Sequence, residues 1–68
     1  MIDSKKAREQ LGLSINEMAS AMGIHRQTWV KWERGERDPG AAALRLIGTL
    51  LWLKKKKMLN KYIEDFME

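Results

Sequence analysis

Several side chains between positions 26 and 31 have the chemistry needed to recognise nucleic-acid bases. Arg26 and Lys31 carry hydrogen-bond donors that suit guanine in a major groove, and the amide of Gln27 can pair with adenine. The neighbouring Thr28 and Val30 complete a mostly polar and cationic strip if this segment is helical. The alternative is that individual side chains in this strip, Val30 above all, are only solvated positions on a helix surface. The strip indicates DNA as a partner if a rigid element holds it outward.

Two short helices joined by a tight turn are predicted over residues 13–35. Ser14 is a favourable N-cap, and Glu17 three residues later completes a Ser-x-x-Glu capping box, so the first helix begins directly after Ser14. Gly23 follows the last apolar residue of that helix and suits the left-handed conformation of a helix end. The second helix begins two or three residues later and ends at Gly35. Two such helices joined by about 3–4 residues make a helix-turn-helix.

Apolar residues in this segment fall at helical spacing. Met18 and Met22 share a face of the first helix, and Trp29 and Trp32 lie i,i+3 on the second. Ala19 is small where the two helix axes must approach. Because the tryptophans can pack on the methionines, we interpret them as core residues and not as stacking partners for bases. The polar strip is then the outer face of the second helix.

Several short motifs occur together in and beyond this segment. They are Leu13-Ser14, Ala19, Gly23, Trp32-Glu33-Arg34-Gly35 and Asp38-Pro39. In these motifs the chain resembles the Cro/CI-like helix-turn-helix family, of the xenobiotic-response-element type, across residues 4–53. The resemblance implies an all-α fold, a compact lambda-repressor-like bundle of four to five helices. It also implies that the second helix of the motif enters the major groove while the first crosses the DNA backbone.

The resemblance also implies which residues contact DNA. The positions that contact bases in the family are occupied here by Arg26, Gln27, Lys31, Thr28 and Val30. Contacts to phosphates, which position a protein without reading sequence, are implied for Arg34 and Arg37. We expect them also for Asn16 and for His25, which could otherwise be the N-cap of the second helix. Ile15 departs from the family, which commonly has a phosphate-binding glutamine there, and Asn16 is the nearest substitute.

A further helix is predicted before the motif. It begins at Asp3 or Ser4 and runs to Leu11. The resemblance implies that Arg8 in this helix forms a structural ion pair with Glu33 at the end of the reading helix. Such a pair would clamp the first helix against the reading helix.

Another helix is predicted after the motif. Asp38 is expected to be its N-cap, with Pro39 in the first helical position, where a missing N–H costs nothing. Its core-facing residues are predicted to be Leu44, Ile47 and Leu51. The apolar residues left over on its other faces are Leu50, Trp52 and Leu53.

Residues 54–68 begin with four lysines and continue with an apolar stripe at helical spacing. The stripe consists of Met58, Leu59, Tyr62, Ile63 and Phe66. It either packs back on its own chain as a fifth helix or forms, with Trp52, a two-fold dimer interface. We favour the dimer, because recognition of palindromic half-sites needs two copies. The expected organisation is therefore a DNA-binding domain over residues 1–53 and a C-terminal dimerisation helix over residues 54–68.

The composition of the chain limits the classes of function that it could have. The chain has 68 residues, enough for one small domain, and a net charge of +4. Residues 1–40 hold seven Lys and Arg against six Asp and Glu, so affinity for DNA must depend on where the charges lie. With no cysteine and a single histidine, we expect no metal site, no cofactor and no enzymatic activity. We also expect a cytoplasmic protein that does not bind membranes, because the N-terminus lacks the apolar core of a signal peptide.

These observations predict a transcriptional regulator that acts as a homodimeric repressor, or autorepressor, on an inverted-repeat operator in double-stranded DNA. Single-domain members of this kind resemble regulators of phages, plasmids and other mobile elements. The alternative is a helical interaction module, such as an antitoxin, whose C-terminal apolar surface binds a partner protein.

Overall fold

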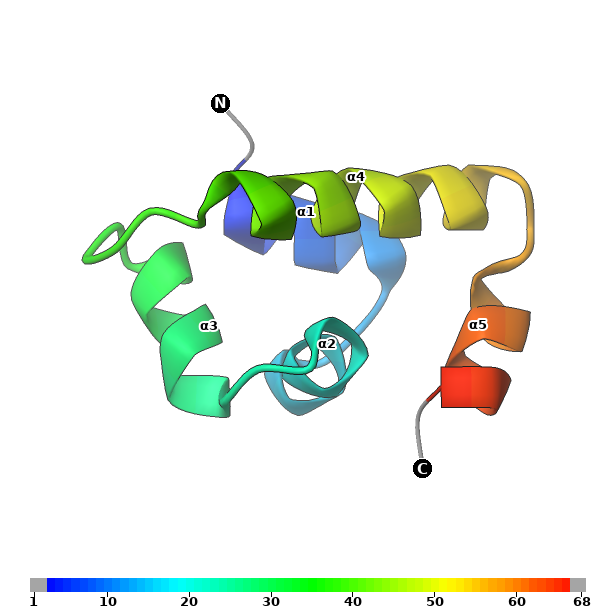
Figure 1. Ribbon diagram of the computed structural model, residues 1–68, viewed down its shortest axis with the longest axis horizontal. Helices are drawn as coiled ribbons and strands as arrows, with labels where there is room; N and C mark the ends of the chain where they lie inside the picture. The colour runs from blue at the N-terminus through cyan, green and yellow to red at the C-terminus, as the bar shows by residue number, and fades with distance from the viewer. Residues whose placement is uncertain (1–2, 67–68) are drawn as a thin grey trace.

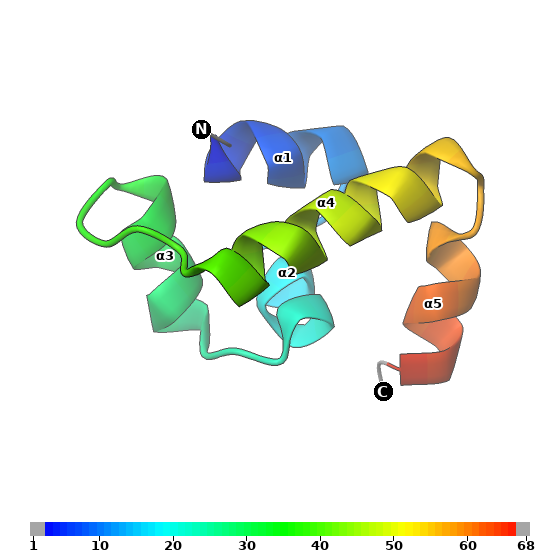
Figure 2. The same cartoon turned by 45° about the horizontal axis from the view of Figure 1, so that its top comes forward.

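Five α-helices follow one another in the computed structural model, which describes residues 3–66 (Figure 1). They are α1 (Ser4–Leu11), α2 (Ile15–Met22), α3 (Arg26–Glu33), α4 (Ala41–Lys55) and α5 (Leu59–Phe66). The described residues contain no strand, so the predicted all-α fold is confirmed. Helix α4 lies along one side of the molecule and α2 and α3 along the other, while α5 stands near the C-terminal end of α4 (Figures 1 and 2).

Local hydrogen bonds set where α1 begins and where α2 begins and ends. Asp3 caps α1 by accepting from the Lys6 amide at 3.1 Å. The predicted capping box of α2 is present, since Glu17 N donates to Ser14 Oγ at 3.1 Å and Ser14 N donates to Glu17 Oε1 at 2.8 Å. Gly23 ends α2 with φ +69°, in the left-handed region that favours glycine. These contacts fix the turn between α2 and α3.

The core lies where α4 crosses the other helices. Its largest fully buried side chains are Trp29, Met18, Ile47 and Leu50. The prediction that Leu50 is left over outside the core is wrong, while Leu44 and Leu51 are only half-buried. The apolar residues at the end of α4 lie on several sides of the helix. Contact with both α1 and α2 determines which of these sides faces the core.

The predicted start of α4 is also wrong. The helix begins at Ala41, after Gly40 as N-cap, and no side chain caps it. Asp38 and Pro39 therefore lie in the loop that links α3 to α4. Pro39 is half-buried there, so its fixed φ shapes the loop and not the first helical turn.

The C-terminal segment breaks from α4 and packs back on the chain. Helix α4 ends at Lys55, and Lys57 turns the chain with φ +61° before α5. Leu59 is 6% exposed, and Tyr62 Oη donates to the Ala21 carbonyl at 2.8 Å. Leu59 is thus part of its own chain's core, which corrects its assignment to a dimer interface. No helix among residues 3–66 combines the length and apolar character needed to cross a bilayer.

The other residues predicted at a dimer interface differ in exposure. Tyr62 and Ile63 are half-buried against their own core. Trp52 and Met58 are 53% and 47% exposed. The side chain of Phe66 lies outside the described residues.

Candidate nucleic-acid interface

A hydrogen-bonded network fixes α3, the candidate reading helix, to the rest of the bundle. Arg8 Nε donates to Glu33 Oε2 at 2.6 Å, and Arg8 Nη2 donates to Glu33 Oε1 at 3.4 Å. Arg8 Nη1 donates to the Leu13 carbonyl at 3.0 Å. One guanidinium therefore joins α1, the turn after it and the end of α3, and the ion pair implied by the family resemblance is present.

Trp29 is a member of this network that the sequence did not indicate. Its ring is fully buried, and Nε1 donates a hydrogen bond to Glu33 Oε2. It also packs edge-on against Trp32, with ring centroids 5.5 Å apart and planes at 65°. The i,i+4 spacing of Trp29 and Glu33 on one helix was the available signal.

The network keeps both Arg8 and Glu33 in their charged forms. Burial alone would raise the pKa of the Glu33 carboxyl, but the hydrogen bonds from Arg8 and Trp29 and the charge of Arg8 outweigh it, so this pKa lies below its ordinary value. The hydrogen bond to Glu33 raises the pKa of Arg8. Both groups are therefore ionised at neutral pH, and their side chains are only 16% and 11% exposed.

Of the predicted base-contacting residues on α3, Gln27 and Lys31 lie opposite this network, whereas Arg26, seven residues before Glu33, lies beside it. Arg26, Gln27 and Lys31 are exposed, and Thr28 and Val30 are half-buried. Gln27 and Lys31 lie i,i+4 and so form one row, while Arg26 and Val30 form the adjacent row. The structure thus brings two parallel rows of side chains to one helix face.

The predicted phosphate contacts lie at both ends of α3. His25 is exposed at the N-cap of α3 and makes no capping hydrogen bond there. A groove between α1, α2 and α3 is lined by Arg8, Ser14, Ile15, Asn16 and Arg26. The exposed Asn16 therefore shares this groove with a residue of the reading helix.

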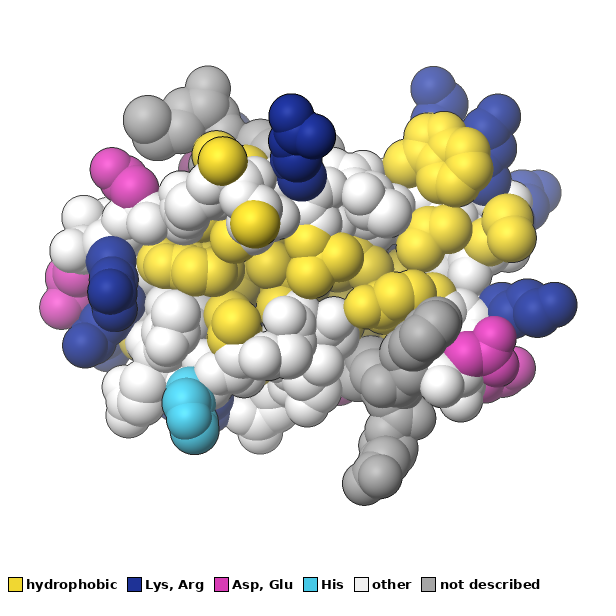
Figure 3. Space-filling model, in the orientation of Figure 1, with side chains coloured by type: hydrophobic (Ala, Val, Ile, Leu, Met, Phe, Trp, Pro, Cys, Tyr) yellow, Lys and Arg dark blue, Asp and Glu magenta, His cyan; other side chains and the backbone are white. Residues whose placement is uncertain are grey.

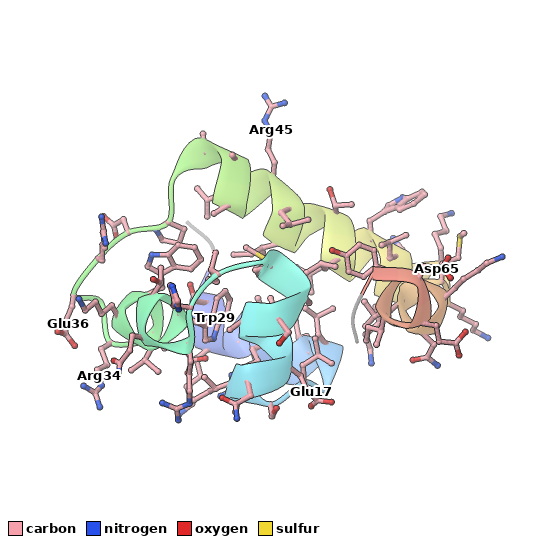
Figure 4. All side chains as sticks on the ribbon, turned by 60° about the horizontal axis from the view of Figure 1, so that its bottom comes forward. Glu17, Trp29, Arg34, Glu36, Arg45 and Asp65 are labelled. Carbon is pink, nitrogen blue, oxygen red and sulfur yellow. The ribbon has the colours of Figure 1, made fainter. Side chains whose placement is uncertain are left out.

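Arg34 and Arg37 lie beyond the other end of α3, in the loop before α4. Both are exposed, and Arg34 projects away from the bundle beside Glu36 (Figure 4). Arg34 Nη1 lies 3.7 Å from Glu36 Oε2, but both side chains are more than half exposed, so this pair contributes little to stability. The arginines can thus move to an external anion at little cost.

Comparison with known proteins identifies a family for this chain. The helix-turn-helix family profile matches residues 5–51. The chain belongs to the helix-turn-helix family. It is also 36% identical over 67 residues to a "Putative HTH-type transcriptional regulatory protein" of Archaeoglobus fulgidus. That alignment covers 94% of this chain and 21% of the relative, so the chain spans about a fifth of the curated relative's length. No solved structure matches the chain.

Membership in the helix-turn-helix family supports DNA binding and transcription regulation. Helices α2 and α3 are the first and second helices of the motif in this chain. The lysine run at residues 54–57 follows the far end of α4, away from the loop that holds Arg34 and Arg37 (Figure 1). The cationic side chains near the end of α3 are therefore Arg34 and Arg37, and the lysine run lies away from them.

Proposed function

We propose that this helix-turn-helix protein is a sequence-specific repressor that binds an inverted-repeat operator as a homodimer, with α3 in the major groove. The observation that supports this most directly is the two-sidedness of α3. Its inner side is held by Trp29 and Glu33, its outer side presents Gln27 and Lys31 to solvent, and Arg26 is exposed beside Glu33. A rigid helix with exposed base-pairing side chains is suited to direct readout.

Each outer residue has a distinct role in this proposal. Arg26 or Lys31 binds guanine O6 and N7, and Gln27 binds adenine N6 and N7, each contact giving about 1–3 kcal/mol of discrimination. The methyl groups of Val30 contact a thymine methyl, and Thr28 flanks the base contacts. These residues set the sequence that each half-site must have.

The phosphate contacts set the position of α3 on the duplex. Asn16 and His25 approach the backbone beside the first turn of α3, and Arg34 and Arg37 approach it beyond the last turn. Because residues 1–40 have nearly balanced charge, affinity depends on these local contacts more than on a general attraction to DNA. Bound at a promoter, including that of its own gene, the dimer would block RNA polymerase.

The test is selection from a pool of randomised duplex DNA at about 0.15 M salt, where purely ionic binding is weak. The proposal predicts recovery of an inverted repeat by the wild-type chain. Gln27→Ala should relax the preference at one position of each half-site. Gln10→Ala is the matched control, since Gln10 is an exposed glutamine on α1. Recovery of no sequence above background would refute the proposal.

A second candidate function is an interaction module of the antitoxin type, in which a partner protein covers the apolar surface of the chain. The exposure of Trp52 and Met58 favours it, as does a band of hydrophobic side chains that crosses one face of the molecule (Figure 3). Alanine at Arg26, Gln27 and Lys31 separates the two functions. Those substitutions should abolish a DNA-reading activity and leave partner binding unchanged.

A further inference from the structure

The two bulky hydrophobic side chains that are most exposed in the described chain both occur at the junction of α4 and α5. Trp52 is 53% exposed and Met58 is 47% exposed. The amide of Met58 donates to the Leu53 carbonyl at 2.7 Å, so the chain at Met58 folds back on the last turn of α4. Hydrophobic side chains gather over this end of the molecule, with cationic side chains beside them (Figure 3). We call Trp52, Leu53, Met58 and Tyr62 the junction surface.

A hollow opens between the end of α4 and α5 within the junction surface. It is lined by Leu53, Met58, Lys61, Tyr62 and Asp65. Tyr62 Oη already donates to the Ala21 carbonyl, so the hollow is offered mainly the apolar part of this ring. The volume of the hollow is about 250 Å³, below the range of about 300–1,000 Å³ that is usual for small-molecule pockets. It therefore fits one anchoring side chain better than a whole small-molecule ligand.

Lysines lie next to the junction surface. Residues 54–57 are four consecutive lysines, Lys61 lines the hollow, and all five are exposed. None of the five forms an ion pair with another described residue. Glu64 and Asp65 are the carboxylates of this segment, so residues 54–65 keep an excess of positive charge. The occupant that fits both the charge and the hollow is an anion with an apolar anchor.

A second copy of the chain does not fit this surface. A two-fold interface centred on the junction surface would bring the lysine runs of the two copies together, and like charges oppose association. Trp52 lies i,i+7 from Arg45 and so on the same side of α4, and Arg45 points away from α2 and α3 (Figure 4). Two copies joined through this side would turn their α3 helices to opposite ends of the dimer. The homodimer of the proposed function must therefore use another surface.

A membrane or a DNA duplex also fits less well than a protein. An amphipathic helix binds a membrane through its apolar face, but α5 turns that face inward, with Leu59 only 6% exposed. The exposed Glu64 and Asp65 would also be repelled by anionic headgroups. Duplex DNA would pair with the lysines and leave Trp52 and the hollow unused. An apolar anchor in a small hollow with charges at its rim is instead typical of protein recognition.

We propose that the junction surface binds an acidic segment of a partner protein. One bulky apolar side chain of that segment enters the hollow beside Trp52, and its carboxylates pair with the lysines at 54–57 and Lys61. This inference gives the partner in the second candidate function a stated chemistry, and it does not depend on DNA reading. The surface lies at the opposite end of α4 from the loop that holds Arg34 and Arg37 (Figure 1). Helix α3 therefore stays free while the partner is bound.

Selection from a library of randomised peptides displayed on phage tests the chemistry of the partner. The full chain, immobilised through an N-terminal tag and without DNA, should enrich peptides that combine several aspartates or glutamates with a bulky apolar residue. Lysine-rich peptides and acidic peptides without an apolar residue should not be enriched. Enrichment of no peptide above background, or of peptides that lack acidic residues, would overturn the proposal.

Fluorescence anisotropy with one enriched peptide then tests the residues. Trp52→Ala and Lys61→Glu should each weaken binding by about 10-fold or more. Lys6→Glu is the matched control, since Lys6 is exposed in α1 and its substitution changes the net charge by the same amount. Circular dichroism should show wild-type helix content for all three variants, because the three side chains are exposed. Unchanged peptide affinity in Trp52→Ala and Lys61→Glu would refute the junction surface as the binding site.

Two further measurements test the other occupants. Cosedimentation of the wild-type chain with phosphatidylserine vesicles that Trp52→Ala abolishes would point to a membrane and overturn the proposal. Self-association in sedimentation equilibrium that Trp52→Ala abolishes would point to a second copy and overturn it equally.

The failure of this inference can be told apart from failure of the proposed function. If the chain selects an inverted repeat but no acidic peptide, only the junction surface is wrong. If it selects acidic peptides but no DNA sequence, only the repressor function is wrong. Both stand if Gln27→Ala leaves the peptide affinity unchanged while it relaxes the DNA preference, and Trp52→Ala does the reverse.

Discussion

The network around Glu33 gives the sharpest prediction about stability. Arg8→Met keeps most of the aliphatic stem of Arg8 but removes its three hydrogen bonds, two to Glu33 and one to the Leu13 carbonyl. Glu33 would be left as a carboxylate whose side chain is 11% exposed and whose remaining donor is Trp29. Breaking one side of a largely buried ion pair costs about 3 kcal/mol.

That loss is large for this chain. A domain of 68 residues has a free energy of unfolding of roughly 3–10 kcal/mol. The midpoint of thermal unfolding should fall by roughly 10–25 °C. Urea denaturation followed by circular dichroism measures the free energy directly, with Arg37→Met as the control because Arg37 is exposed.

A double variant separates the ion pair from general damage. Adding Glu33→Gln to Arg8→Met removes the unpaired charge, while the amide oxygen at position 33 can still accept from Trp29. The double variant should therefore be more stable than Arg8→Met alone. If Arg8→Met is as stable as Arg37→Met, or if Glu33→Gln worsens it, the network is not what holds α3.

Three further predictions concern pH and DNA. Because the folded pKa of Glu33 lies below its ordinary value of 4.5, its contribution to stability is complete above that value and is lost as the pH falls through the folded pKa. The difference in urea midpoint between wild type and Glu33→Gln should therefore shrink below about pH 4.5. Gln27→Ala should cost about 1–3 kcal/mol at one base pair of each half-site and leave the others unchanged, as measured by competition binding. Arg37→Ala should weaken binding evenly across sequences and lower the slope of log affinity against log salt by about one unit. A base-specific effect of Arg37→Ala would contradict its phosphate role.

The helix-turn-helix unit was predictable from the sequence because its signals act over a few residues. The Ser14–Glu17 capping box and Gly23 fix where α2 begins and ends through bonds within one turn of chain. The i,i+3 pair of Trp29 and Trp32 fixes which side of α3 is inward, and so which side is polar. Those short-range effects determine the candidate reading face.

Tertiary contacts determined how α4 and α5 pack and how Glu33 is paired. The apolar run of α4 fits several inward faces, and Leu50 is buried because α4 packs across both α1 and α2. The stripe of α5 fits either its own chain or a second copy, and Leu59 faces inward because Lys57 reverses the chain. The ion pair of Glu33 likewise joins it to Arg8, which lies 25 residues earlier in the chain, so it forms only when α1 packs against α3. Sequence patterns specify which surfaces are apolar, and packing between distant segments determines which of them are covered.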